Sequence, residues 1–315
     1  MQYNKISLSD TFKATAPFLL VRTLVYGVMT LFMIIAGVIS IIVLSAGNGA
    51  ATMLSLIIFG SSLAVTKWVE RYILYIVKAG HVFAITEYIR TGKAPVTEKG
   101  YKGIIAFGTE QVKNNFGTTN VAFIADSLIS GAVKQINKFL SKAGEFLSFI
   151  PGAEFVISII SMIIGISLNY IDEAVLSYIF MHREESNVWK KTCDAIVFYG
   201  QSWKSILKSA LKITLAIVGV RFATIGLGFL FGLAFGAGNG ALVGLIIGLI
   251  FLYAVNKILV DPFATIIMIN EYYTAIEGQE VRVDLYNKFA LASNKFSELF
   301  NKSRDGELTY SNEII

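Results

Sequence analysis

The amino-acid sequence predicts an all-α, polytopic helical integral membrane protein with an internal repeat of helical hairpins. Of 315 residues, 55% are hydrophobic and only 16% charged, whereas soluble domains average about 25% charged. Two long apolar runs, 215–235 and 241–253, flank the turn 236–240. The motif Ala-Gly-Asn-Gly-Ala occurs twice, at 46–50 and at 237–241. These observations favour duplicated membrane hairpins over soluble domains.

Helices are the expected conformation of the apolar runs. With its continuation, each run reaches the roughly 20 residues that cross a ~30 Å hydrocarbon layer. Because that layer contains no water, the backbone must satisfy its own polar groups, as it does in a helix. The net charge of +5 suits contact with anionic headgroups. We expect no nucleic-acid partner, because no polar domain concentrates Lys and Arg.

Two further classes of feature are not expected. Cys193 is the only cysteine, which excludes an intramolecular disulfide and a cysteine metal cluster. The first ten residues are polar and lack the apolar core and cleavage site of a secretory signal. We therefore expect the first hydrophobic run to stay in the membrane.

The repeat has an offset of 191 residues. This offset also aligns Phe12-Lys13 with Trp203-Lys204, and Glu70 with Asp261. Transporters are often built from duplicated halves, although Gly-Asn-Gly is also a common turn by itself. The repeat predicts four parts: repeat 1 (1–91, an interfacial helix plus a transmembrane hairpin), a central helical insert with amphipathic helices and a third hydrophobic segment (92–198), repeat 2 (199–282, built like repeat 1) and a polar C-terminal tail (283–315).

The first repeat begins with an expected interfacial helix over 7–22. Its apolar residues recur at helical spacing, and Lys13 and Arg22 are long enough to reach headgroups. Pro17 predicts a bend before the first crossing, 23–45. The second crossing begins near Thr52, becomes charged after Val65, and should leave the membrane near 75–78 and continue to about Arg90.

The central insert begins after a loop at 91–101. Residues 102–142 have an amphipathic helical pattern, interrupted at 117–119. Lys134, Lys138 and Lys142 form a basic stripe opposite apolar positions. Such a stripe is typical of a helix on an anionic membrane surface or of a solvated helix face, and both interpretations stay open.

A third hydrophobic run covers 153–181, followed by a basic stretch, 183–212, in which we expect one helix over 187–200 and a second helix entering the hairpin. Pro262 should kink the last helix, which ends near Ile276. The positive-inside rule places the basic regions and the N-terminus in the cytoplasm, yet the run 153–181 between two of them is long enough to cross. Three interpretations stay open. The run 153–181 is re-entrant or interfacial, or a second weak crossing lies within 116–133. Otherwise the repeat is inverted and the stretch 183–212 faces outward.

Six polar residues are candidates for an intramembrane or substrate-path role. Asp172 and Glu173 interrupt a hydrophobic run, and Asn169 lies one helical turn from Glu173. A carboxylate inside a membrane is costly and suggests function, but a crossing over 152–171 would place Asp172 at the interface instead. Lys257 and Asp261 are spaced to pair, as a gate, a binding element or structural glue. Glu70 occupies the position equivalent to Asp261.

No motif predicts an enzyme or a bound cofactor. The two histidines, His81 and His182, are too few and too isolated for a metal site. The chain has neither a phosphate-binding glycine loop followed by lysine nor a nucleophile elbow. We expect no catalytic residues, cofactor or metal.

Several short blocks together resemble the choline transporter-like family. They lie at 103–108 (GIIAFG), 168–172 (LNYID), 196–203 (IVFYGQSW) and 260–278. They follow the order of that family and cover about an eighth of the chain, but the first two are further apart than in that family and the crossings are fewer. The resemblance implies an integral membrane protein that passes choline-like cations, with Asp172 and Asp261 inside matched blocks.

The leading functional hypothesis is a multi-pass protein of the cell membrane that transports a small organic cation or forms a channel. The alternative is a non-transporting membrane scaffold or lipid-interacting protein, favoured by the basic amphipathic helices. Membrane lipids are the expected partners in both cases, and a small cationic solute in the first. A polar cavity between the hairpins would favour transport, and hairpins sealed against each other would favour the scaffold.

Overall fold

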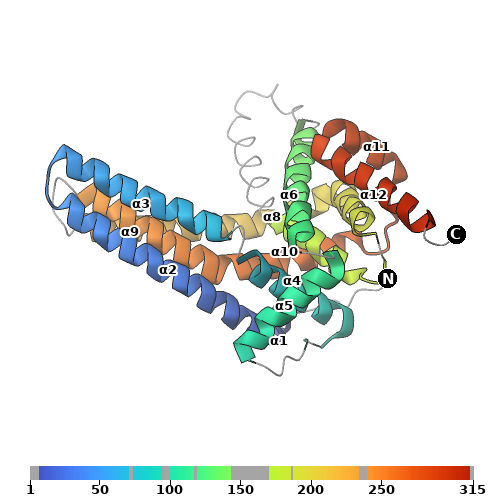
Figure 1. Ribbon diagram of the computed structural model, residues 1–315, viewed down its shortest axis with the longest axis horizontal. Helices are drawn as coiled ribbons and strands as arrows, with labels where there is room; N and C mark the ends of the chain where they lie inside the picture. Colours follow the sequence, from blue (N-terminus) through green and yellow to red (C-terminus); the bar gives the residue numbers. More distant parts are fainter. Residues whose placement is uncertain are drawn as a thin grey trace. The chain divides into compact units, whose positions relative to one another are not determined.

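The computed structural model describes residues 7–70, 74–93, 95, 100–116, 119–142, 170–185, 187–233 and 240–312. These residues form helices joined by short connections, with no β-strand among them (Figure 1). The predicted all-α class is therefore confirmed. The helices are α1 (Leu8–Ala14), α2 (Ala16–Leu44), α3 (Gly49–Val69), α4 (Tyr75–Thr91), α5 (Gly100–Phe116), α6 (Thr119–Lys142), an unlabelled helix at 170–181, α8 (Val188–Leu233), α9 (Gly240–Val255), the π-helical turn η3 (Asn256–Val260), α10 (Asp261–Ile276), α11 (Val283–Ala292) and α12 (Asn294–Asn312).

The chain forms two compact units. Unit 1 comprises Met1–Ala16, Ala79–Thr214 and Ala264–Ile315, and unit 2 comprises Pro17–Lys78 and Leu215–Phe263. Unit 2 thus contains both apolar runs that carry the repeated motif, whereas unit 1 contains the amphipathic and polar segments. The division into repeats, insert and tail stays a prediction.

In unit 2, helices α2, α3 and α9 lie lengthwise side by side (Figure 1). The turn between α2 and α3 has the predicted chemistry, because Gly47 adopts a φ of 71° and the Asn48 side chain accepts a hydrogen bond from the Ala51 N–H at 2.8 Å. Met33, Phe59 and Ile246 form the buried core between the three helices. The interior of unit 2 is therefore apolar over this region.

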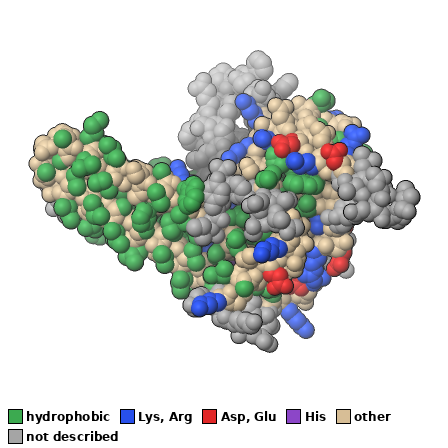
Figure 2. Space-filling view, viewed as in Figure 1, with side chains coloured by type: hydrophobic (Ala, Val, Ile, Leu, Met, Phe, Trp, Pro, Cys, Tyr) green, Lys and Arg blue, Asp and Glu red, His purple; other side chains and the backbone are tan. Residues whose placement is uncertain are grey.

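The outside of unit 2 is also apolar. Figure 2 shows hydrophobic side chains over its visible face, whereas charged side chains gather on the visible face of unit 1. Leu20 and Met53 are each 69% exposed, and Phe222 is 72% exposed. Among the described helices, three are long and apolar enough to cross a membrane: Ala16–Leu44, Gly49–Val69 and the continuous stretch Gly240–Ile276.

Glycines bring α8 and α9 into close contact. A Cβ atom added at Gly228 would overlap the backbone of Gly248, and one added at Gly232 would overlap that of Gly244. Small residues at such spacing allow helix backbones to approach closely in membranes. In this pair of helices the glycines therefore serve packing.

Unit 1 is built around the helix at 170–181, whose side chains are almost all buried. Helices α11 and α12 pack on each other and on α6 (Figure 1). The polar tail, for which no helix was expected, therefore forms two packed helices. Phe289 also packs α11 against α8. Its ring lies against Gly200, where any Cβ atom would overlap it.

Two expectations about helix limits need correction. The interfacial helix 7–22 is interrupted at Thr15, so that Arg22 belongs to α2. This interruption lies directly before Pro17, where a bend was predicted, and Pro17 itself is in the first turn of α2, where its missing N–H costs nothing. The two helices expected between 187 and 235 are one continuous helix, α8, because a single glycine such as Gly200 costs only ~1 kcal/mol in a helix.

Candidate functional site

Three of the six candidate residues meet in unit 2. The Lys257 ammonium lies 3.2 Å from a carboxylate oxygen of Glu70 and 3.3 Å from one of Asp261. Asp261 also lies 4.0 Å from the guanidinium of Arg22. Two cations and two carboxylates thus form a charge-balanced chain, hereafter the ion-pair network (Arg22, Asp261, Lys257 and Glu70).

The network joins two hairpins. Arg22 comes from α2 and Glu70 directly follows α3, whereas Lys257 and Asp261 lie where α9 passes into α10. The closest ion pair therefore crosses from one hairpin to the other. The predicted pairing of Lys257 with Asp261 is present, and Glu70, the repeat-equivalent residue, shares the same lysine.

A π-helical turn places Lys257. The turn η3 covers Asn256–Val260, immediately before Asp261 and Pro262. Pro262 has no N–H to donate to the preceding turn, and single π turns inside α-helices, although rare, are frequent at functional sites. The interruption predicted at Pro262 is thus a change of helical hydrogen bonding at the residues before it.

Tyr26 completes the surroundings of both cations. Its ring centroid is 5.7 Å from Cζ of Arg22 and 5.8 Å from Nζ of Lys257. Both distances are within the range of cation–π attraction. The aromatic face and the carboxylates together offset the cost of holding two cations in a largely apolar unit.

The network lies at one depth of the hairpins. Glu70, Asp261 and Arg22 each stand about 21 or 22 residues from the turn end of their helix, at Gly49, Gly240 or Leu44. At 1.5 Å per residue that is roughly 32 Å, close to the ~30 Å thickness of a hydrocarbon layer. The charges are therefore spaced to stand at one face of the layer when the turns stand at the other.

Arg22 was wrongly expected to extend to headgroups. It is 1% exposed, among the most deeply buried large side chains of the described residues. The sequence suggested only that it lies near the start of an apolar run. Its partner Asp261 is distant in sequence and not at the repeat offset, so only the fold brings the two together.

Arg221 adds a second polar contact between hairpin helices of unit 2. Its Nε donates to the side-chain oxygen of Asn256 at 3.2 Å, and the Asn256 amide donates to the Leu252 carbonyl at 2.7 Å. Asn256 was not among the candidates, although its place beside Lys257 in an apolar helix could have identified it.

Asp172 and Glu173 lie in unit 1. Glu173 is 3% exposed and accepts a hydrogen bond from the Thr265 hydroxyl of α10. Asp172 is half-buried, and its carboxylate accepts from the Glu173 N–H at 3.0 Å. Asn169 lies outside the described residues. The proposed pairing of Asn169 with Glu173 therefore stays a prediction.

A buried hydroxyl cluster follows Glu173 along the same helix. The Ser177 hydroxyl is 2.6 Å from that of Thr86 on α4 and 3.1 Å from that of Tyr273 on α10. Because Glu173 and Ser177 are four residues apart, they share one helix face. Polar side chains thus fix the packing of three helices inside unit 1.

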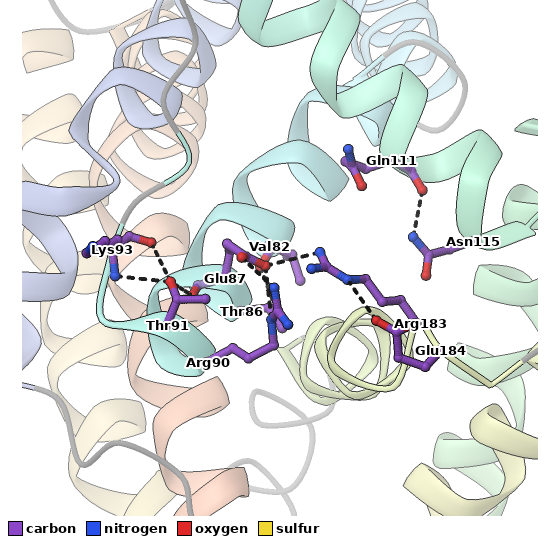
Figure 3. A network of polar contacts seen from close by, with 10 residues as sticks. All are labelled: Val82, Thr86, Glu87, Arg90, Thr91, Lys93, Gln111, Asn115, Arg183 and Glu184. Carbon is purple, nitrogen blue, oxygen red and sulfur yellow. Dashed lines mark hydrogen bonds and ion pairs between the residues drawn. The ribbon is translucent and has the colours of Figure 1, made fainter.

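An exposed ion cluster lies between α4 and the turn after 170–181 (Figure 3). Glu87 accepts from Arg90 at 2.7 Å and from Arg183 at 3.2 Å. Because all three side chains reach solvent, such pairs contribute at most about 1 kcal/mol. This cluster connects α4 with the turn after the helix at 170–181.

Asp194 is a half-buried carboxyl of unit 1 whose pKa is shifted. Burial raises its pKa above the ordinary value, and the Tyr286 hydroxyl, which donates a hydrogen bond to it, partly opposes this effect. Burial and the neighbouring Asp194 likewise raise the pKa of Tyr286. Tyr286 is therefore a hydrogen-bond donor throughout the neutral pH range, and it ties α11 to α8.

Comparison with known proteins adds no relative. No protein-family model, curated protein or solved structure matches this chain. In the ion-pair network the carboxylates are already neutralised by Lys257 and Arg22, and the helices beside it pack through apolar side chains and glycine backbones.

Proposed function

We propose that this is a multi-pass integral protein of the cell membrane that acts as a non-transporting scaffold or lipid-interacting protein. In this proposal the hairpins of unit 2 cross the bilayer and unit 1 provides a polar helical body. The supporting observation is the surface of unit 2, on which long apolar helices expose Leu, Ile, Val, Met and Phe side chains. Exposed apolar area on this scale marks a membrane or protein contact.

The packing inside unit 2 favours a scaffold. Met33, Phe59 and Ile246 fill the space between α2, α3 and α9, and glycine contacts close the space between α8 and α9. A solute path needs polar groups that line an open cavity. The balanced ion-pair network at one end is better suited to holding the hairpins together.

Trp68 offers a test of membrane insertion. It is 60% exposed and lies at the end of α3 that is next to Glu70. If the hairpins cross the bilayer, Trp68 stands at the interface, where Trp is enriched. In Trp189→Phe/Trp203→Phe protein in vesicles, we expect lipids brominated near the headgroup to quench its fluorescence more than lipids brominated near the chain ends.

A matched control places a tryptophan in the middle of the span. Leu56→Trp, combined with Trp68→Phe in the same background, should reverse the order of quenching, since residue 56 lies about 11 Å from Gly49 along α3. Equal, weak quenching at both positions would show that unit 2 is outside the bilayer and would refute the proposal.

The ion-pair network also supports a second proposal, transport of a small organic cation, which the resemblance to the choline transporter-like family implies. Lys257 has two acidic partners at similar distances, so it can keep one of them while the hairpins separate. In proteoliposomes, Asp261→Asn or Asp172→Asn should then abolish uptake of labelled choline without loss of folding. No uptake by the wild type, or unchanged uptake in both variants, would count against transport.

A further inference from the structure

Arg221 is a cation in an apolar part of unit 2. It lies on α8, is half-exposed, and its Nε donates to the side-chain oxygen of Asn256, a neutral group, at 3.2 Å. Among the described residues no carboxylate forms an ion pair with Arg221, whereas Arg22 and Lys257 have acidic partners. A charge inside a membrane protein is costly and is almost always paired. The counter-charge of Arg221 must therefore come from a bound partner.

The contact with Asn256 orients the guanidinium. The Asn256 amide donates to the Leu252 carbonyl at 2.7 Å, which directs its oxygen to Arg221. A guanidinium carries five N–H donors, and this contact uses the one on Nε. The N–H groups of the two terminal nitrogens make no hydrogen bond within the described part of the chain. Together they form a planar fork, which matches two oxygens of a phosphate or a carboxylate.

The depth of Arg221 favours a phosphate. Its partner Asn256 lies 16 residues after Gly240, the turn end of α9. At 1.5 Å per residue that is about 24 Å, so an inserted unit 2 would hold both residues in the last quarter of a ~30 Å hydrocarbon layer. From there the long arginine side chain extends to the headgroup level, where every phospholipid carries a phosphate.

The surface beside Arg221 suits acyl chains. Phe222, the next residue of α8, is 72% exposed, and Leu259, three residues after Asn256, is 55% exposed. A basic group between membrane helices, next to apolar surface, is typical of sites that bind lipid headgroups. A carboxylate of another protein would need to lie at the same depth, where such groups are rare, whereas lipid surrounds any inserted chain.

We propose that Arg221, positioned by Asn256, binds the phosphate of a membrane phospholipid whose acyl chains lie along α8 and η3. This inference rests on the proposed membrane insertion of unit 2, and it assigns the proposed lipid interaction to one site. Inorganic phosphate offers the same oxygens without the chains, so it should bind far more weakly than the lipid.

Native mass spectrometry of the full-length protein in detergent tests the site. The protein is titrated with phosphatidylglycerol, with glucosyldiacylglycerol, which has the same chains and no phosphate, and with inorganic phosphate. The first phosphatidylglycerol should bind on the order of tenfold more tightly than the glycolipid, because hydrogen bonds to a charged group are the stronger ones. No adduct of inorganic phosphate is expected. Arg221→Leu should lose the preference for phosphatidylglycerol.

Two further variants separate lipid binding from a structural role. Asn256→Asp gives Arg221 a carboxylate in the place of the amide oxygen, so the preference should be lost while the thermal unfolding midpoint is retained. If Arg221 served packing alone, Asn256→Asp would leave lipid binding unchanged. Lys67→Leu is the matched control, because it removes an exposed cation of unit 2 from a different helix, α3, and should keep the preference.

Equal affinity of the wild type for both lipids, or an unchanged preference in Arg221→Leu or Asn256→Asp, would overturn the proposal. Inorganic phosphate bound as tightly as the lipid would assign the site to a free anion. A dimer that dissociates in Arg221→Leu would assign it to a carboxylate of a second copy. Failure of insertion is recognised separately, because Trp68 quenching makes no reference to Arg221. A protein that inserts without preferring phosphatidylglycerol refutes only the Arg221 site.

Discussion

Arg22 illustrates how a single side chain depends on the whole of unit 2. Its guanidinium is buried and reaches Asp261 at 4.0 Å across two hairpins. Replacing one partner of a buried ion pair typically costs about 3–5 kcal/mol, because the other charge is left uncompensated. Asp261 keeps Lys257 as a second partner, so the cost here should fall near the lower end.

We therefore expect Arg22→Met to lower the midpoint of thermal unfolding in detergent by several degrees, measured by circular dichroism. The exchanged pair Arg22→Asp/Asp261→Arg should recover part of the loss. An Arg22→Met protein as stable as the wild type would mean that this ion pair contributes nothing.

Asp194 gives a prediction about pH. Because burial raises its pKa in the folded state, the folded chain binds this proton more tightly than the unfolded chain. The stabilisation is present at low pH and is lost as the pH rises from the ordinary carboxyl range, near 4, into the raised range. The Asp194→Asn variant, whose side-chain oxygen can still accept from Tyr286, should lack this dependence.

The check compares unfolding midpoints of wild type and Asp194→Asn across that pH range. The wild type should lose stability relative to the variant by a few degrees as the pH rises. Parallel curves for the two proteins would contradict the assignment.

At the residue scale, the sequence predicted the local pairing and missed the distant one. Lys257 and Asp261 are four residues apart on a helix, so spacing was sufficient to pair them. The contact of Arg22 with Asp261 and the place of Tyr26 beside two cations depend on how the helices pack. The spacing of residues along the sequence cannot predict these contacts.

At the element scale, glycine distinguishes packed from open helix faces. A Cβ atom at Gly228 would overlap the backbone of α9, whereas one at Gly226, two residues earlier on α8, would meet open space. We expect Gly228→Ala to destabilise the protein by about 1–3 kcal/mol through overpacking. Gly226→Ala should be neutral or stabilising by up to ~1 kcal/mol.

Thermal unfolding of both variants in the same detergent tests this difference. Equal midpoints would show that α8 and α9 have room to separate. The comparison is matched in residue type and helix, so a general effect of alanine on helix stability cannot produce the expected result.

Most elements followed from apolar periodicity, and the exceptions have physical causes. The break at 117–119 was predicted from Gly117-Thr118-Thr119, and the structure ends α5 at Phe116 and begins α6 at Thr119. The break expected near Gly200 is missing, because a single glycine costs a helix only ~1 kcal/mol, and this glycine leaves room for Phe289. Helices α11 and α12 were not predicted, since their stability depends on docking to α6.

At the scale of the whole molecule, the two units differ in what their surfaces can contact. Unit 2 presents apolar side chains and a polar end, and unit 1 presents charges over a buried core. Composition alone predicted a membrane protein with helical hairpins. It could not predict that Asp172 and Glu173 belong to the buried helix of unit 1, because the partner of Glu173 there, Thr265 of α10, lies 92 residues further along the chain.

The crossed ion pair between Lys257 and Glu70 has a consequence for biosynthesis. The first hairpin leaves the ribosome about 190 residues before Lys257 and Asp261 are made. At about 5–20 residues per second, Lys257 is synthesised roughly 10–40 s after Glu70. The second hairpin, in contrast, contains both members of the ion pair Lys257–Asp261. During that interval the first hairpin lacks its ion pairs with Lys257 and Asp261.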